Sequence, residues 1–151
     1  MSLKRKQLLE SAYLFLENHD KFTPESVIAD RTSSCTHTLL PSSIPVGPRN
    51  NSEYSAFIAD MKQVMHNFKL HIVPGTEPVV DEVTRQVTLQ LTSHSETNIG
   101  LYANEYIWIL KFSEDGKQIE KIVEFADSAY TLNMLPKLLD ELGKNATIGA
   151  V

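Results

Sequence analysis

Two neighbouring stretches of the chain, residues 101–112 and 118–127, combine apolar side chains with groups capable of acid–base chemistry. Successive side chains of a strand point to opposite faces. One face of the first stretch would therefore carry two phenols, an amide and an indole: Tyr102, Asn104, Tyr106 and Trp108. The same face of the second stretch would add Glu124 between Ile122 and Ala126. A few polar groups among apolar neighbours are typical of a small-molecule pocket and are not needed in a plain core.

Glu124 is the strongest candidate for proton transfer. Burial among apolar side chains disfavours a charged carboxylate and raises its pKa, and a pKa near neutrality suits a general acid or base. The alternative is a structural glutamate that pairs with Arg31 or Arg85. An adjacent arginine would oppose the rise in pKa, so the geometry decides between the two readings.

Three further residue types could bind and polarise a substrate. The planar fork of Arg31 could hold an oxyanion, or it could satisfy the last carbonyls of a preceding helix. Tyr102 and Tyr106 lie about 13 Å apart along a strand and could bracket a multi-ring substrate. They could equally be core tyrosines whose hydroxyls reach the rim. Trp108 is expected to form a deep apolar wall.

The remaining candidates have weaker support for a catalytic or binding role. His37 could line the mouth of the pocket, although a lone histidine in a connector more often packs or lies at the surface. Cys35 beside His37 faintly resembles a nucleophile pair, which spacing alone does not make. The five histidines lack metal-ligand spacing and the six glycines are scattered, so we expect no metal site and no phosphate loop. Asp127 is expected to cap the last helix.

The elements that would position these groups follow from periodicity and from start and stop signals. A turn at Asp115-Gly116 joins the two stretches into a hairpin. Apolar residues recur at helical spacing with caps, or alternate as in strands, in the other segments. We expect helices over 2–18, 23–30, 50–68 and 128–143, and strands over 68–74, 79–81 and 83–94. Residues 32–48 are expected to form a connector with a short extended piece at 35–40.

This order predicts an α+β protein in which a curved antiparallel sheet wraps around N-terminal helices and a C-terminal helix follows. We expect a single domain over 1–143 and a flexible tail over 144–151. The net charge of −5 argues against a nucleic-acid partner. The absence of a long apolar run argues against a membrane span. One cysteine excludes an internal disulfide and fits a reducing, cytoplasmic location.

Several local motifs resemble a known family. They are Arg31-Thr-Ser-Ser-Cys35-Thr-His37, Leu40-Pro41-Ser42-Ser43, Asn51-Ser-Glu-Tyr54, Glu105-Tyr106 and Glu124-Phe-Ala-Asp-Ser-Ala-Tyr130. The chain resembles the SnoaL-like branch of the nuclear-transport-factor-like, or cystatin-like, superfamily, and especially the small fungal isomerases and cyclases of secondary metabolism. The resemblance implies a cone-shaped fold and rearrangement of hydrophobic polyketide, meroterpenoid or indole-alkaloid intermediates without a metal or organic cofactor.

Within that family the chain most resembles the semipinacolases that make brevianamide-type spiro-indoxyl alkaloids. The resemblance assigns catalytic roles to Arg31, Tyr102, Tyr106 and Glu124, with Asn104, Trp108 and His37 as substrate contacts. The activity implied is a semipinacol rearrangement of a hydroxy-indolenine intermediate. Ring-expanding relatives rely on acidic and histidine residues near the third helix and in late strands. The chain offers Glu53, Asp60 and His66 near that helix but no histidine in its last strand, which makes ring expansion less expected.

Two alternatives remain open. One is a polyketide or meroterpenoid cyclase, or a ring-expanding isomerase, that uses the same pocket. The other is a non-catalytic ligand-binding or dimerisation module. A homodimer is compatible with every reading, and the family resemblance implies that it would form through the convex sheet face. That face would carry apolar residues between charged ones: Glu105, Ile107, Ile109, Lys111, Val123 and Phe125.

Overall fold

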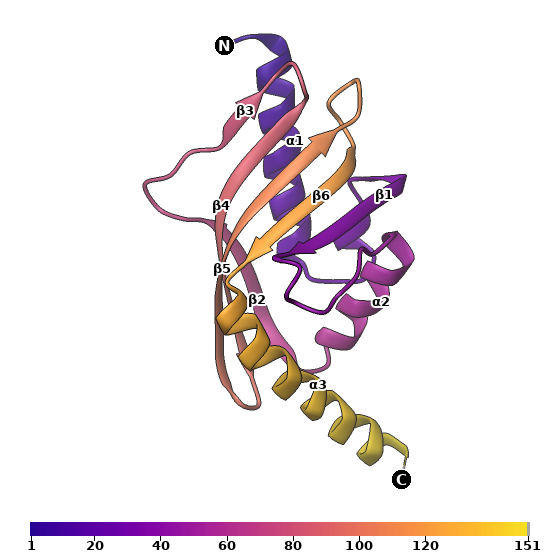
Figure 1. The fold of residues 1–151 in the computed structure, drawn as a ribbon. Helices are drawn as coiled ribbons and strands as arrows, with labels where there is room; N and C mark the ends of the chain where they lie inside the picture. The colour runs from indigo at the N-terminus through magenta and orange to yellow at the C-terminus, as the bar shows by residue number, and fades with distance from the viewer. Residues whose placement is uncertain (151) are drawn as a thin grey trace.

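The computed structural model describes the backbone of residues 1–150 and the side chains of residues 1–144, arranged as helices packed against one curved sheet of six strands (Figure 1). The helices are α1 (Leu3–Asp20), the short 3₁₀ helix η1 (Ser26–Ile28), α2 (Asn51–Met61) and α3 (Ser128–Ala150). The strands are β1 (Arg31–Leu40), β2 (Met65–Ile72), β3 (Val79–Asp81), β4 (Gln86–Thr97), β5 (Gly100–Phe112) and β6 (Ile119–Ala126). The predicted α+β class is confirmed.

The strands lie in the order β1-β6-β5-β4-β2, and β3 pairs with the first three residues of β4, Gln86 to Thr88. Neighbouring strands are antiparallel except β1 and β6, which run parallel. Residues 32–34, expected as connector, and residues 35–40, expected as a short extended piece, belong to the full strand β1. This strand precedes α2, so the expected order of three helices before the sheet is wrong. The Ser- and Thr-rich sequence of β1 gives little local signal, and its partner β6 lies far away in sequence.

Local hydrogen bonds explain where the helices begin. The Ser2 hydroxyl accepts a bond from the Arg5 amide at 3.0 Å. Asn50 accepts from the Glu53 amide at 2.8 Å and donates its own amide to the Glu53 carboxylate at 3.1 Å, which makes a reciprocal capping box. Asp127 accepts from the Tyr130 amide at 3.1 Å, as the sequence predicts. Each cap satisfies amides that the first helical turn leaves without partners.

The last helix runs further than the sequence predicts. Gly143 was expected to end it, but α3 continues to Ala150. Glycine permits the left-handed conformation of a helix end without imposing it. The domain boundary at 143 and the flexibility of residues 144–151 stay predictions, and Val151 lies outside the described residues.

The core lies between α1 and the concave face of the sheet. Figure 1 shows α1 running along the strands, with α2 and α3 toward one end of the sheet. Alternate residues of β4 and β5 point inward and are fully buried or nearly so: Val87, Leu89, Leu91, Trp108, Leu110 and Phe112. Leu8 and Phe15 of α1 pack in the same core. This scaffold fixes the inward face that carries the candidate residues.

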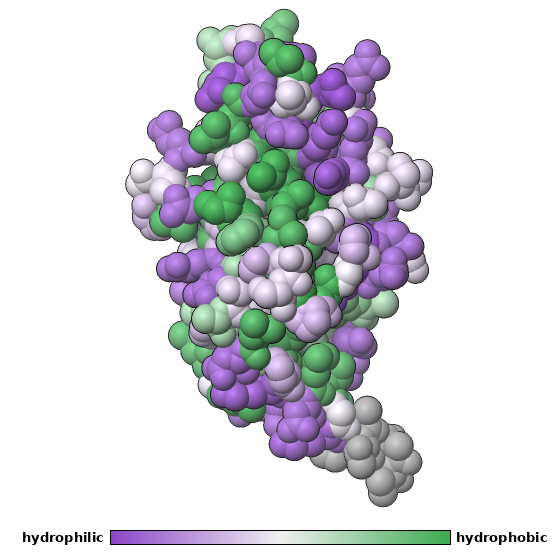
Figure 2. Space-filling model, viewed as in Figure 1, coloured by the Kyte–Doolittle hydropathy of each residue, from purple (hydrophilic) through white to green (hydrophobic). Residues whose placement is uncertain are grey.

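The outward face of the sheet carries exposed apolar side chains. Ile107 and Phe125 lie directly opposite each other on β5 and β6 and are 38% and 50% exposed. Figure 2 shows hydrophobic side chains between hydrophilic ones on the face of the molecule that is seen in Figure 1. The homodimer expected through this face stays a prediction. No helix in the described part of the chain is long and apolar enough to cross a membrane.

Candidate active site

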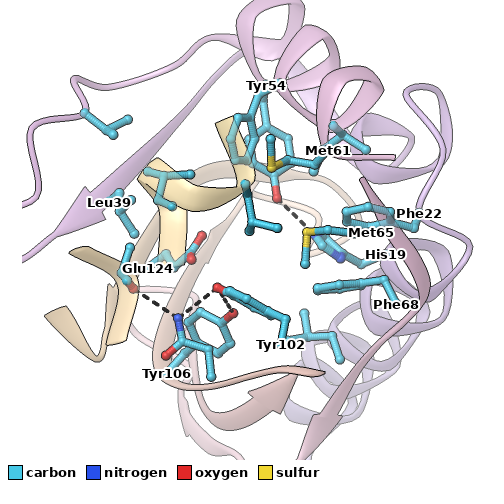
Figure 3. A pocket seen from close by; sticks show the side chains of 18 of the residues that line it. His19, Phe22, Leu39, Tyr54, Met61, Met65, Phe68, Tyr102, Tyr106 and Glu124 are labelled. Carbon is cyan, nitrogen blue, oxygen red and sulfur yellow. Dashed lines mark hydrogen bonds between the residues drawn. The ribbon is translucent and has the colours of Figure 1, made fainter. Parts of the chain in front are cut away.

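A pocket opens at the end of the sheet where α2 and α3 approach the concave face. The space between its walls is about 770 Å³, part of it open to solvent. Its walls are mainly aromatic and aliphatic. Figure 3 shows Glu124 and Tyr106 across this space from Phe22, Phe68 and Met65. The polar residues of the lining are His19, Arg49, Tyr54, Tyr102, Asn104, Tyr106, Glu124 and Thr131.

The hairpin of β5 and β6 places its polar groups as the sequence predicts. Trp108 lies opposite Glu124 in the register, and Tyr106 lies opposite Ala126. Tyr102, Asn104, Tyr106, Trp108 and Glu124 all line the pocket. Period-2 alternation in a twisted hairpin is sufficient to bring them together.

Glu124 is held by a chain of two further side chains. Its Oε1 lies 2.8 Å from His37 Nε2, and His37 Nδ1 lies 3.2 Å from a terminal guanidinium nitrogen of Arg31. The side chain of His37 is 2% exposed and that of Glu124 is 16% exposed. Arg31 is buried as well. A carboxylate that faces the pocket is thus connected through one imidazole to a cation behind the wall.

The arginine determines which nitrogen of His37 carries the proton. A guanidinium can only donate, so His37 Nδ1 must accept. Burial and the charges of Arg31 and Arg49 hold the pKa of His37 well below its usual value, so the ring is neutral. Its single proton therefore sits on Nε2 and is donated to Glu124 Oε1. This leaves Oε2 of Glu124 as the oxygen free to exchange a proton with a ligand.

The environment of Glu124 suits proton transfer near neutral pH. Burial raises the pKa of its carboxyl from 4.5 to about 7, and the charges of Arg49 and Arg31 oppose that rise. The alternative of a direct structural pair with Arg31 or Arg85 does not describe this site, because Glu124 bonds to His37 instead.

Two predicted contact residues lie behind the pocket wall. Neither Arg31 nor His37 belongs to the pocket lining. Arg31 donates through Nε to the Val27 carbonyl at 3.1 Å and lies 4.3 Å from the centre of the Tyr54 ring. The contact with Val27 fits the alternative of a cation at the end of a helix, and the catalytic role of Arg31 stays a prediction. The expected place of His37 at the pocket mouth is wrong. The strand β1, which the sequence did not fully reveal, carries both side chains inward.

The two tyrosines converge and do not bracket a ligand. Their hydroxyl oxygens lie 3.4 Å apart, although the residues are two pleats apart on a strand. Tyr106 also bonds to Ser93 on β4 at 2.8 Å. Burial raises the pKa of both phenols, so both keep their protons and act as hydrogen-bond donors.

Asn104 positions Tyr102 and has little left for a ligand. Its Oδ1 accepts from the Glu105 amide, which fixes the orientation of the side-chain amide. Its Nδ2 donates to the Tyr102 hydroxyl at 2.9 Å and to Thr131 Oγ1 at 3.0 Å. Because Tyr102 accepts from Asn104, its own proton is available to Tyr106 or to a bound molecule.

Sequence reasoning missed three residues of the site. Arg49 lies in the loop before α2, where no periodicity marks it. Tyr54 enters the sequence analysis only as the last residue of the motif Asn51-Ser-Glu-Tyr54, and its ring stacks on His37 with ring centres 4.3 Å apart. His19, one of the five histidines without metal-ligand spacing, lines the pocket, and its Nε2 bonds to the Tyr54 hydroxyl at 2.8 Å. Long-range packing alone reveals these contacts.

Other candidates have no evident role in the pocket. Burial raises the pKa of the Cys35 thiol, which does not suit a nucleophile. Glu53, Asp60 and His66 are exposed and outside the lining. The described residues contain no group of three or more His, Cys, Asp or Glu side chains that could hold a metal ion.

The chain is similar to fungal proteins of secondary metabolism. It is 39% identical over 130 residues to austinoid biosynthesis clusters protein H of Penicillium brasilianum. The aligned region covers 85% of this chain and 88% of that protein. The crystal structure of BvnE pinacolase from Penicillium brevicompactum matches with a TM-score of 0.88 and 35% identity, over 93% of this chain and 96% of that one.

A more distant match concerns the fold alone. A SnoaL-like protein of Shewanella denitrificans aligns with a TM-score of 0.68 at 10% identity, over 86% of this chain and 97% of that one. No family model matches the sequence.

Proposed function

The chain belongs to the SnoaL-like family of fungal secondary-metabolite isomerases and cyclases, and from the pocket geometry we propose that it is a cofactor-independent semipinacolase. In this proposal it converts a hydrophobic hydroxy-indolenine intermediate into a spiro-indoxyl product. Similarity to a protein described as a pinacolase supports this choice of reaction.

The hydrogen-bonded chain from Arg31 through His37 to Glu124 is the observation that carries the proposal. It directs one oxygen of a carboxyl group toward a largely apolar pocket, and the carboxyl group has a pKa of about 7. A group with this pKa is substantially ionised at neutral pH and can both take and return a proton. In this arrangement Glu124 acts on the substrate, and Arg31 and His37 are positioning residues.

A semipinacol rearrangement needs only such a proton exchange. Glu124 takes the proton of the substrate hydroxyl, and the oxygen forms a ketone as the neighbouring carbon–carbon bond migrates to the imine carbon. The electron pair of the imine passes to nitrogen, which receives the proton back from Glu124. Substrate and product therefore have the same composition, and no oxidant or reductant is required.

The two tyrosines would orient the substrate without ionising. Their hydroxyls meet at 3.4 Å on the strand next to Glu124, and the raised pKa of each phenol keeps it protonated. A donor directed at the substrate nitrogen or oxygen stabilises charge that develops during migration. The apolar walls exclude water and hold one reactive conformer.

Product analysis with wild type and Glu124→Gln tests the proposal. Glutamine keeps the size of the side chain and an oxygen that can accept from His37, but it cannot act as a base. We expect a single spirocyclic isomer from wild type in the absence of added metal or cofactor, and a rate lower by on the order of 10²–10³ in the variant.

The matched control is Glu120→Gln, which removes a carboxylate from the same strand outside the pocket lining. It should leave turnover unchanged. Near-normal turnover by Glu124→Gln would remove Glu124 from the mechanism. A product yield from wild type equal to that of the reaction without enzyme would remove the semipinacolase assignment.

A cyclase or ring-expanding isomerase acting on a polyketide or meroterpenoid is the second candidate. The 39% identity to a protein of an austinoid biosynthesis cluster favours it. Against it stands the position of Glu53, Asp60 and His66, all exposed and outside the pocket lining. Turnover of an austinoid intermediate but not of a hydroxy-indolenine would favour this candidate.

A further inference from the structure

Arg49 is a cation in the pocket lining that the proposed reaction does not use. Its guanidinium lies over the ring of Phe57, with 4.1 Å between the central carbon and the ring centre. Among the residues whose side chains are described, none accepts a hydrogen bond from this guanidinium. Arg31 differs in this respect, because it donates to the Val27 carbonyl and to His37.

The backbone of Arg49 is tied to the residue that holds Glu124. The Arg49 amide donates to the His37 carbonyl at 2.9 Å, and the His37 amide donates to the Arg49 carbonyl at 2.8 Å. This two-way pairing joins the loop before α2 to the edge strand β1. The position of Arg49 relative to Glu124 is therefore set by backbone bonds and by packing on Phe57.

The charges around the pocket do not cancel. With Glu124 ionised and His19 and His37 neutral, two guanidinium groups act on one carboxylate. Glu53 also acts on Arg49, but its carboxylate is exposed and bonded to the Asn50 amide. A half-buried guanidinium with free donors, next to apolar space, is suited to a negatively charged oxygen.

We propose that Arg49 contacts the substrate directly and binds an oxygen that carries negative charge, such as a carboxylate, an enolate or a developing alkoxide. The inference deepens the proposed function and rests on it for the assumption that the reaction takes place in this pocket. It transfers to Arg49 the oxyanion-binding role that the sequence suggested for Arg31.

A pair of small probes of nearly the same shape, one anionic and one neutral, can test this role without any turnover. Trp108 is the one tryptophan of the chain and lines the pocket, so nitroaromatic ligands that enter should quench its fluorescence. The probes are 4-nitrobenzoate and its neutral amide, 4-nitrobenzamide. We expect Arg49→Met to weaken 4-nitrobenzoate binding about 10-fold or more, because a charged hydrogen bond contributes about 1.5–3 kcal/mol. The affinity for 4-nitrobenzamide, whose carbonyl oxygen carries no net charge, should fall by a smaller factor.

Two further variants separate the local contact from general effects. Arg5→Met removes the same charge from α1, outside the pocket lining, and should leave both affinities unchanged. Arg49→Lys keeps the charge but loses the planar fork, so it should give an intermediate affinity for 4-nitrobenzoate. Thermal melting of each variant shows whether it is folded.

The inference is overturned if wild type shows no preference for 4-nitrobenzoate, if Arg49→Met weakens both probes equally, or if Arg5→Met has the same effect. These outcomes are distinct from failure of the proposed reaction. Selective loss of anion binding together with no product from the hydroxy-indolenine would leave Arg49 as the anion contact and remove the semipinacolase. Product formation with unchanged probe selectivity in Arg49→Met would remove only the role of Arg49.

Discussion

At the scale of single residues, the pKa of Glu124 reflects a balance between burial and two nearby cations. Burial raises it to about 7, and Arg49 and Arg31 act in the opposite direction. Without those cations a carboxyl in this position would hold its proton more tightly. The arginines thus keep an ionised carboxylate accessible at neutral pH while the apolar pocket keeps it basic.

This balance predicts the pH dependence of activity. As a base, Glu124 must be ionised in the free enzyme, so kcat/KM should rise with pH and reach half its maximum near pH 7. Arg31 lowers the pKa of Glu124, so Arg31→Met should move that midpoint to higher pH. Arg31→Lys keeps the charge and should move it less. Profiles of kcat/KM against pH for the three proteins measure the effect.

The control for this prediction is Arg85→Met. Arg85 donates to the Phe112 carbonyl outside the pocket lining, so its loss should not move the midpoint. A shift to lower pH in Arg31→Met, or the same shift in Arg85→Met, would contradict the assigned influence of Arg31 on Glu124.

At the scale of elements, β1 and the loop that follows it matter most for the site. β1 supplies Arg31 and His37, and its register places Leu39 beside Glu124 of the parallel strand β6. The loop then returns through Arg49 to α2, which contributes Tyr54 and Phe57. An extended piece was expected only at residues 35–40, whereas β1 begins at Arg31. Its first residues were expected as connector because a parallel edge strand owes its stability to a distant partner.

The start of α2 gives a prediction for one element. Asn50→Ala removes the side-chain acceptor of the capping box and should lower the free energy of unfolding by about 1 kcal/mol. Urea denaturation measures it. Asn50→Asp keeps an acceptor oxygen near the helix N-terminus and should preserve most of the stability. Equal losses in Asn50→Ala and Asn50→Asp would show that the cap is not the cause.

At the scale of the whole molecule, buried neutral histidines link stability to pH. The pKa of His19 falls from 6.5 to about 3, mainly because of burial, and that of His37 also falls well below its usual value. The unfolded chain binds protons at these sites below pH 6.5 and the folded chain does not. Their contribution is therefore complete above pH 6.5 and is lost as the pH falls below it, and for His19 the loss continues to about pH 3.

The contribution of Glu124 to stability changes with pH in the opposite direction. Its raised pKa contributes stability below pH 4.5 that is lost as the pH rises through about 7. Between pH 4.5 and 6.5, acidification protonates both histidines in the unfolded chain but only Glu124 in the folded chain. These three groups together therefore lower the free energy of unfolding as the pH falls. The Cys35 thiol and the phenols of Tyr102 and Tyr106, whose pKa values are raised, do not titrate in this range.

A histidine substitution isolates one of these groups. His19→Gln should reduce the loss of unfolding free energy between pH 6.5 and 4.5 by about 2 kcal/mol relative to wild type, since the unfolded imidazole goes from half to almost fully protonated over these two pH units while the folded one stays neutral. Urea denaturation at both pH values measures this difference, whatever the variant's stability at neutral pH. The exposed His71→Gln is the control and should keep the wild-type dependence. An unchanged dependence in His19→Gln would contradict the assignment.

The sequence by itself determined the parts of the molecule that depend on near neighbours. Alternation over residues 101–126 predicted that Tyr102, Asn104, Tyr106, Trp108 and Glu124 share an inward face, and the register of β5 and β6 confirms it. Caps at Ser2, Asn50 and Asp127 were predictable because each acts within three residues. Strand periodicity and helix capping are local effects, so local patterns carry them.

Only the tertiary structure decided which residues of the site contact one another. His37 and Glu124 are 87 positions apart, and they meet because β1 lies parallel to β6. The same packing moves Arg31 behind the wall, brings Arg49 to the pocket and joins His19 of α1 to Tyr54 of α2. Burial and the distances between charges set the pKa values and the proton positions. Neither quantity exists until the chain has folded.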